Sequence, residues 1–232
     1  MLCDVLHEAS HFMQRDFGEI VQLQNSKKGT QDFTNKCYER IKYKLIKSLT
    51  ERRPSYGIIS TNEKFPQDRE FVVVIEPISG INNFQRSIPF CCIAVSLFEQ
   101  ESQEPLAIAI HNPILRETFY AAKGLGAWFE NYNETIVPKS RMRISIQNSF
   151  SDAFISSSLS INSNSINLGC DLLEIAYLSA ARLDILIKRS DNLMTKAAFI
   201  LIREAGGHVH LKDNYFLASN DSLHKQAIDT LL

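Results

Sequence analysis

The segment EPISGINNF, Glu76 to Phe84, carries the residues whose types and spacing best suit metal-assisted chemistry. Its acidic residue, Glu76, directly follows the apolar run FVVVI. That run predicts a buried strand, because all five residues are β-branched or aromatic. A carboxylate at this place can ligate a hard cation such as Mg²⁺, which prefers oxygen ligands. Pro77 and Gly80 predict a turn that ends the strand.

The same segment resembles DPIDGTTNF, the metal-binding motif of the inositol monophosphatase family. The residues that shape the turn are shared, and they are Pro77, Ile78, Gly80, Asn83 and Phe84. Further segments resemble this family in the same order, namely LQNSKKGTQDF, RRPSYGII, HNPILRETFYAAKGLGAWFEN, AYLSAARLD, KAAFILIREAGG and ASNDSLHKQAIDTLL. The whole is most similar to the family's bacterial SuhB-type branch. The resemblance implies an α/β (α+β) fold, a layered αβαβα sandwich, forming one domain over residues 1–232 with packed halves of about 1–145 and 146–232.

In this family, paired Mg²⁺ ions activate a water molecule and neutralise the phosphoryl group that is transferred. The resemblance places the family's ligand and catalytic positions on Tyr38, Thr61, Asn62, Glu76, the carbonyl of Ile78, Ser79, Ile81 and Thr195. Glu76 is the one carboxylate that remains of the four that the family uses as ligands. We therefore expect Mg²⁺ affinity and phosphatase rate to collapse, with no cofactor bound at ordinary concentrations.

The resemblance places the family's substrate contacts on Lys28, Gly80, Gly169, Cys170 and Lys188. Asp171, next to Cys170, puts a carboxylate where a phosphate ester would lie. Lys188 reverses the charge of a family glutamate that contacts inositol, which argues against inositol as the substrate. Lys28 by itself is better explained as a surface lysine.

Two functions from different classes follow. The first is a non-catalytic interaction module; the SuhB-type branch implies a role in transcription antitermination with RNA polymerase and Nus factors. The second is a weak or altered Mg²⁺-dependent phosphomonoesterase acting on inositol monophosphate or another small phosphate ester. In that case a shift of Glu63 or Asp191 into the site would restore a ligand. A family helix is missing between Phe154 and Gly169, where family dimer contacts partly lie, so a homodimer and a monomer both stay open.

Composition narrows the partners and the compartment. A net charge of −1 gives no overall attraction to nucleic acid or acidic membranes, and the basic residues between Lys27 and Arg53 predict a solvated helix face. The longest apolar stretch, Phe90 to Phe98, is far shorter than the ~20 residues that a membrane-spanning helix needs. The N-terminus has no signal-peptide pattern. Five cysteines without a CxxC motif predict reduced thiols in a cytoplasmic protein, with Cys91 and Cys92 in the core.

Hydrophobic periodicity predicts the elements that position these residues. The expected helices are Leu2–Met13, Asn35–Leu49, Leu172–Leu186 and Thr195–Glu204. Strands dominate from Phe71 to Tyr120. Within them Leu106–Ile110 and Thr118–Ala122 form a hairpin across His111-Asn112-Pro113, followed by a turn at Gly124 and Gly126. A Ser/Asn-rich loop is expected from Ser156 to Asn167.

Other patterns of catalytic residues are weaker. The chain has no GxSxG, HExxH or P-loop motif. His7 and His11 lie one helical turn apart, and His208 and His210 alternate on an expected strand. Each pair predicts a polar surface rather than a metal site, because the sequence places no third ligand beside it.

Overall fold

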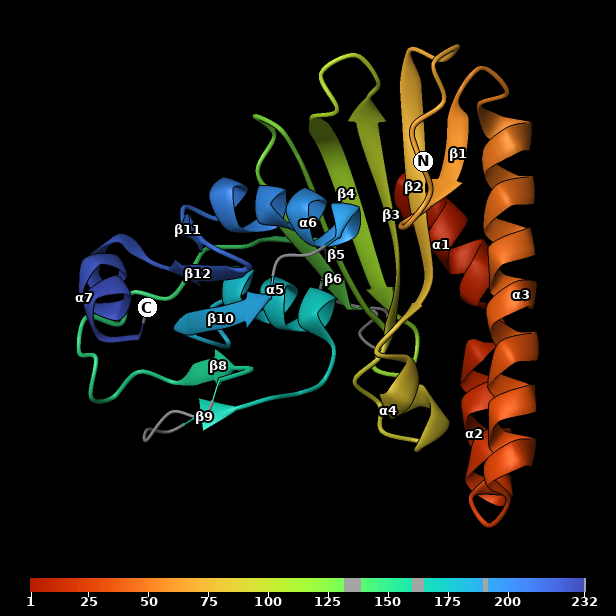
Figure 1. Cartoon of the computed structure of the whole chain (residues 1–232), viewed down its shortest axis with the longest axis horizontal. Coiled ribbons are helices and arrows are strands. Elements are labelled where there is room, and N and C mark those ends of the chain that lie inside the picture. Colours follow the sequence, from red (N-terminus) through yellow and green to blue (C-terminus); the bar gives the residue numbers. More distant parts are fainter. Residues whose placement is uncertain (132–138, 160–164, 190–191, 232) are drawn as a thin grey trace.

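Two mixed sheets with two helices between them form the framework of the chain (Figure 1). The computed structural model describes residues 1–131, 139–159, 165–189 and 192–231. The large sheet has the strand order β1 (Gly57–Ser60), β2 (Phe71–Ser79), β3 (Cys92–Glu99), β4 (Pro105–Asn112), β5 (Glu117–Ala122), β6 (Ala127–Asn131) and β7 (Ser140–Arg141). The small sheet has the order β11 (His208–Lys212), β12 (Tyr215–Ser219), β10 (Ile185–Arg189), β8 (Ile155–Ser157) and β9 (Ser165–Ile166).

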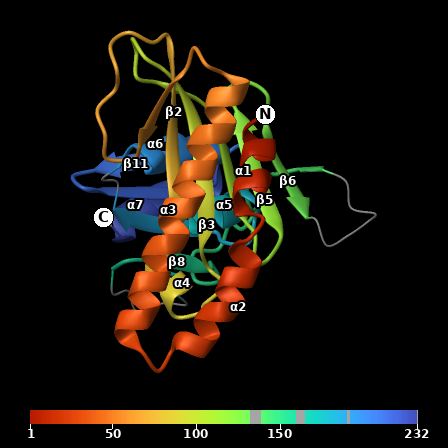
Figure 2. The ribbon, with the colours of Figure 1, turned by 90° about the vertical axis from the view of Figure 1, so that its right-hand side faces the viewer.

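The helices complete five layers. On one face of the large sheet lie α1 (Leu2–Ser10), α2 (Met13–Leu23) and α3 (Lys27–Arg52), as Figure 2 shows. Between the sheets lie α5 (Asp171–Ser179) and α6 (Leu193–Glu204), and α7 (Asp221–Leu231) covers the outer face of the small sheet. The short α4 (Ile81–Gln85) follows β2. This arrangement is the αβαβα sandwich that the sequence predicts.

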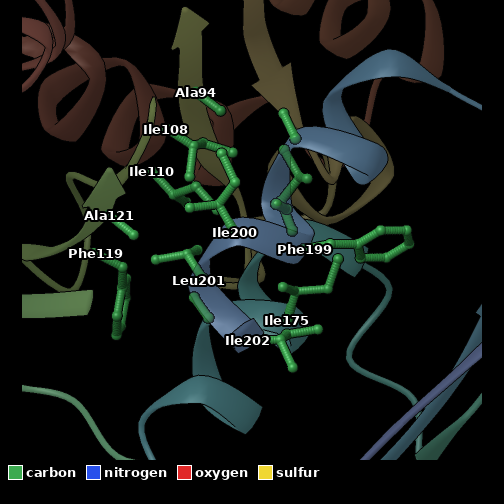
Figure 3. Packing of buried hydrophobic residues seen from close by; sticks show 14 of the residues in the cluster. Ala94, Ile108, Ile110, Phe119, Ala121, Ile175, Phe199, Ile200, Leu201 and Ile202 are labelled. Atoms are coloured by element: carbon green, nitrogen blue, oxygen red, sulfur yellow. The ribbon is translucent and has the colours of Figure 1, made fainter. Parts of the chain in front are cut away.

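The large sheet is buried on both faces, which explains the unbroken apolar character of β2. Side chains that alternate along a strand enter two different cores. Val72 and Val74 pack between the sheets, and Val73 and Ile75 pack against the helical layer of α1 and α3. In the inner core, Ile200, Leu201 and Ile202 of α6 pack near residues of β4 and β5 (Figure 3). Most side chains of the two helices between the sheets are therefore buried.

Two predicted helix boundaries at the N-terminal end are wrong. The first helix ends at Ser10 and α2 begins at Met13, because α1 packs against both α3 and the large sheet, whereas α2 packs against α3. The helix predicted from Asn35 begins at Lys27 instead. Ser26 caps it by accepting a hydrogen bond from the N–H of Gly29 at 3.1 Å. Its basic residues Lys28, Lys36 and Lys47 are exposed, as the predicted solvated face requires.

The helix predicted for Leu172–Leu186 is also wrong in its second half. Helix α5 ends at Ser179, Ala181 adopts a positive φ of 58°, and the chain then enters strand β10. The largely apolar segment from Leu172 to Leu186 is compatible with a buried helix or a buried strand, so periodicity could not separate the two here. The start of α6 at Leu193 is two residues earlier than predicted, because Asn192 supplies the N-cap.

The predicted hairpin is confirmed, with Ile108 opposite Ala121 in the antiparallel pair β4 and β5. His111 and Asn112 belong to β4, so the turn lies after them. Gly124 and Gly126 both have positive φ, as the predicted turn requires, and their N–H groups each donate to Glu204 at 2.7 Å.

The loop predicted for Ser156–Asn167 is wrong in part. Its ends join the small sheet, in β8 and in the short edge strand β9. Ser156 is fully buried, and its hydroxyl donates to Glu174 at 3.0 Å.

Within the described residues, no helix has both the length and the apolar character that crossing a membrane requires.

Candidate active-site pocket

A pocket of about 300 Å³ opens at the end of β2, where the first turns of α5 and α6 meet it. Its walls come from both halves of the chain, and the lining residues are Glu76, Ser79, Gly80, Asn167, Gly169, Cys170, Asp171, Leu172, Asn192, Met194 and Thr195. Seven of the positions named from the sequence are among them, namely Glu76, Ser79, Gly80, Gly169, Cys170, Asp171 and Thr195. Residues more than a hundred positions apart are thus brought to one cavity.

The turn after β2 gives the pocket its floor. Gly80 adopts φ +73°, in the left-handed region that glycine tolerates best. A Cβ atom at this position would lie 2.7 Å from the carbonyl oxygen of Phe90, so no larger residue fits without a shift of the backbone. The register of β2 against β3 also changes between Glu76 and Ser79, and this irregularity re-aims both side chains at the end of the strand.

Glu76 is held by a hydroxyl group from the neighbouring strand. The Thr61 hydroxyl donates to the Glu76 carboxylate at 2.6 Å and lies 3.3 Å from the carbonyl oxygen of Ile75. Burial raises the pKa of Glu76, and the hydrogen bond from Thr61 offsets part of that rise. The predicted metal position of Thr61 is therefore occupied by a hydrogen-bond donor rather than by a ligand with a negative charge.

Asn83 ties the two halves together beside the pocket. Its side-chain amide donates to the carbonyl of Phe90 at 2.8 Å and to the carbonyl of Leu168 at 2.6 Å. Gly169 follows Leu168 with φ +73°, and a Cβ atom there would meet Asn83 at 3.2 Å. These contacts explain why the turn after β2 and the chain before α5 lie side by side.

The N-terminal ends of α5 and α6 both line the pocket through their first residues. In α6, the side chain of Asn192 accepts a hydrogen bond from the N–H of Thr195 at 2.8 Å, which fixes the first turn. In α5, Cys170 occupies the N-cap position. Helix N-termini carry partial positive charge, so these two ends favour negative charge in the pocket.

Lys188 lies behind the pocket wall and is neutralised there. Its ammonium group, only 1% exposed, forms an ion pair with the fully buried Glu174 and lies 3.6 Å from Asp171. It also donates to Asn167 at 2.9 Å. Lys188 is therefore not among the residues that line the cavity, although it positions two that do.

Other residues named from the sequence are not among those that line the pocket. Tyr38 on α3 is half-buried, and burial, followed by the nearby charge of Glu76, raises its pKa. Asn62 is exposed, Ile81 opens α4, and Lys28 is exposed on α3. Ile78 is buried in the core on the helical side of the sheet.

Of the two residues expected to restore a ligand, Glu63 and Asp191, the structure describes only Glu63. Glu63 is exposed and caps its own turn, accepting a hydrogen bond from the N–H of Ser60 at 3.0 Å. It also pairs with Lys42 at 3.8 Å and does not line the pocket. Asp191 lies outside the described residues.

Sequence reasoning missed Asn167, Asn192 and Met194 as lining residues. Asn192 carried a usable signal, because an asparagine just before a helical run predicts an N-cap. Asn167 and Met194 had none, since only the meeting of the two halves brings them to the cavity. Within the described residues, no three His, Cys, Asp or Glu side chains are grouped so that they could hold a metal ion.

Each histidine pair has a further histidine ring beside one of its members. His7 packs against His111 with ring centroids 4.7 Å apart, and both rings contact the hydroxyl of Thr118. At the other pair, the ring of His224 lies 5.4 Å from that of His208. Strand pairing and helix packing bring these third rings close.

The chain has counterparts among known proteins. The model of the inositol monophosphatase family matches residues 2–227. The protein named inositol-1-monophosphatase from Caulobacter vibrioides is 25% identical over 99% of each chain. The Nus factor SuhB from Xylella fastidiosa is 26% identical over 87% of this chain and 77% of its own length. The crystal structure of extragenic suppressor protein SuhB from Bartonella henselae has a TM-score of 0.80 at 22% identity, covering 97% of this chain and 94% of that one. By the match to its family model, this chain belongs to the inositol monophosphatase family.

Proposed function

We propose that this chain is a non-catalytic member of its family, a protein-interaction module whose partner belongs to the transcription machinery. The observation that carries the proposal is the environment of Glu76. The other predicted side-chain ligand positions around it, Thr61, Ser79 and Thr195, carry neutral hydroxyl groups.

This donor set fits a pair of Mg²⁺ ions poorly. Mg²⁺ requires hard oxygen ligands in octahedral geometry, and two ions need several negative charges beside them. The carboxylate of Glu76 accepts the Thr61 hydroxyl, and burial disfavours its charged form. Phosphoryl transfer depends on neutralising charge on the transferred group, so a pocket with these ligands supports little of it.

The choice of partner rests on the relatives. Proteins named Nus factor SuhB from Xylella fastidiosa, Buchnera aphidicola and Vibrio cholerae are 26%, 24% and 22% identical to this chain. Their name assigns them to transcription, and this chain shares its fold with an extragenic suppressor protein SuhB. A homodimer remains part of the proposal, to be tested by sedimentation.

The alternative is a phosphomonoesterase with an altered metal site, and Asp171 is the observation that favours it. Its carboxylate lines the same pocket as Glu76, and the N-terminal ends of α5 and α6 favour an anion there. Two carboxylates could hold a single Mg²⁺ beside a phosphate ester. The ion pairing of Asp171 with Lys188 weakens this alternative, because it draws the carboxylate toward the buried ammonium group.

Thermal unfolding with and without metal separates the two. A ligand that binds only the native state must raise the melting temperature by mass action. We expect no rise in millimolar Mg²⁺ or Mn²⁺, and no turnover of inositol monophosphate near the ~10 s⁻¹ typical of enzymes. The C. vibrioides inositol-1-monophosphatase serves as the positive control. A metal-dependent rise that disappears in Glu76→Gln would establish the alternative.

The interaction itself is tested with purified components. The chain should bind bacterial RNA polymerase assembled with Nus factors, and the affinity should be the same in chelator, in Mg²⁺ and for Glu76→Gln. Absence of binding to each component alone and to the assembled complex would refute the partner, whatever the result with metal.

A further inference from the structure

Two cysteine thiols meet beside the pocket from different layers of the fold. Cys92 begins β3 in the large sheet, and Cys170 is the N-cap residue of α5. Their Sγ atoms lie 3.7 Å apart, although the residues are 78 positions apart in the sequence. Because a disulfide joins sulfurs at about 2.05 Å, the bond requires only a small inward movement.

The two thiols differ in access. Cys170 lines the pocket, and its Sγ also lies 3.7 Å from the Ser79 hydroxyl. A small polar oxidant that enters the pocket therefore meets Cys170 first. Cys92 is fully buried behind it, and burial, followed by the hydrogen bond with Cys170, raises its pKa. Cys92 is therefore reached only through Cys170 and is placed to react second, losing its proton as its sulfur attacks.

We propose that Cys92 and Cys170 form a reversible disulfide when the protein meets a hydroperoxide, and that this bond is a redox-operated clamp between the large sheet and α5. Exposed to a hydroperoxide, the Cys170 sulfur attacks the O–O bond, becomes a sulfenic acid and releases water or an alcohol. The Cys92 sulfur then attacks the Cys170 sulfur. The sulfenic oxygen leaves as water with the Cys92 proton, so the two thiols together supply two electrons and two hydrogens.

The disulfide would change the contacts in the pocket wall and the stability of the whole chain. Gly80 faces Cys170 so closely that a Cβ atom there would lie 3.2 Å from Sγ, so a movement of Cys170 toward Cys92 would alter this contact at the pocket floor. The link closes a long loop of chain, which restricts the unfolded state and stabilises the folded one. Disulfides in reducing compartments are mostly transient and redox-sensing, and this one is expected to reopen with thiol reductant.

A neighbouring cysteine provides the matched control. Cys91 is also fully buried, but it packs in the core on the helical side of the sheet, whereas Cys92 and Cys170 share the core between the sheets. Cys91→Ala should therefore leave the oxidation unchanged. Cys170→Ser should fold well, because serine is a preferred N-cap residue, and it should abolish the cross-link.

The experiment treats the full chain with hydrogen peroxide, blocks remaining thiols with iodoacetamide and maps the peptides by mass spectrometry without reduction. We expect Cys92 and Cys170 peptides joined with loss of two hydrogen atoms, and a melting temperature higher by about 5 °C that returns to its starting value in dithiothreitol. In Cys92→Ala, dimedone should trap a sulfenic acid on Cys170.

Three results would overturn the proposal. They are alkylation of both thiols after peroxide treatment, a cross-link that uses Cys91 instead, and a cross-link between two molecules. The inference is independent of the proposed function, because its readouts are a covalent mass and a melting temperature. Neither depends on metal, on phosphatase activity or on a transcription partner.

Discussion

Thr61, Ser79 and Thr195 present hydroxyl groups to the region of Glu76, so the pocket avoids the mutual repulsion that clustered carboxylates would cause without a cation. Restoring the charges should therefore destabilise the protein unless metal is present. We expect the triple variant Thr61→Glu, Ser79→Asp, Thr195→Asp to melt on the order of 5 °C lower in chelator and to recover in Mg²⁺. Differential scanning fluorimetry in both solutions measures this.

The matched control for that variant keeps its size without its charge, as Thr61→Gln, Ser79→Asn, Thr195→Asn. Its melting temperature should be the same in chelator and in Mg²⁺. If the acidic variant also shows no dependence on Mg²⁺, these positions do not act on one ion, and the assignment of the family's ligand positions to them is wrong.

His111 gives the fold a pH dependence. Burial, and then the neighbouring His7, lower its pKa to about 3. The unfolded histidine, with a pKa near 6.5, binds a proton that the folded one rejects between these two values. Stability is therefore complete above about pH 6.5 and falls as the pH drops toward 3, by roughly 2 kcal/mol at pH 5 from this group.

Urea unfolding at pH 7.5 and pH 5 tests this dependence. His111→Asn keeps a polar atom near the position of Nδ1, which contacts Thr118 at 2.9 Å, and should lose much less stability on acidification than the natural protein. His11→Asn, on the exposed end of α1, should behave like the natural protein. Equal acid losses in all three proteins would contradict the assignment.

At the scale of elements, the turn between β2 and α4 depends on a glycine. Gly80→Ala should cost about 2 kcal/mol or more, because its φ of +73° and the carbonyl 2.7 Å from the new Cβ both oppose a side chain. Gly18→Ala in α2 is the contrasting case. It has open space around it and should stabilise the helix by about 0.5–1 kcal/mol. Denaturant midpoints of the two variants should move in opposite directions.

The link between the two halves depends on Asn83. Its side chain donates hydrogen bonds to the carbonyls of Phe90 and Leu168, and Leu168 is 85 positions away in the sequence. Asn83→Ala should cost about 2 kcal/mol, because both carbonyl groups lose a buried donor. Asn82→Ala, on the exposed side of α4, should change stability by less than about 0.5 kcal/mol. If Asn83→Ala and Asn82→Ala lowered the free energy of unfolding in urea by similar amounts, the two hydrogen bonds of Asn83 would not contribute to stability.

At the scale of the whole molecule, one core spans both sheets. A single buried cluster contains residues of β4, β5, α5, α6 and β12. Separation of the two sheets would therefore expose this cluster to water. We therefore predict one cooperative unfolding transition, as expected for the single domain inferred from the sequence. Near-ultraviolet and far-ultraviolet circular dichroism should give coincident curves in urea. Two separated transitions would show that the halves, about 1–145 and 146–232, are independent units.

The residues by themselves determined the hairpin, the turns and the strand before the site, whereas the layers were implied by the resemblance to the family. The apolar run Phe71–Ile75 predicted a buried strand through its β-branched and aromatic residues, and the glycines at 80, 124 and 126 fit backbone angles that other residues avoid. These features are local, so spacing and residue type are enough to predict them. The resemblance to the family, rather than the spacing of residues, predicted which positions of the family motif would form the site.

The tertiary structure decided where those side chains act. Periodicity could not tell that the largely apolar stretch after Leu172 changes from helix to strand, because both α5 and β10 are mostly buried and neither shows a clear polar face. It could not show that Lys188 would be neutralised by Glu174, or that Cys92 would meet Cys170. Those contacts join residues from different layers, and their distances depend on how the layers pack rather than on the sequence near either residue.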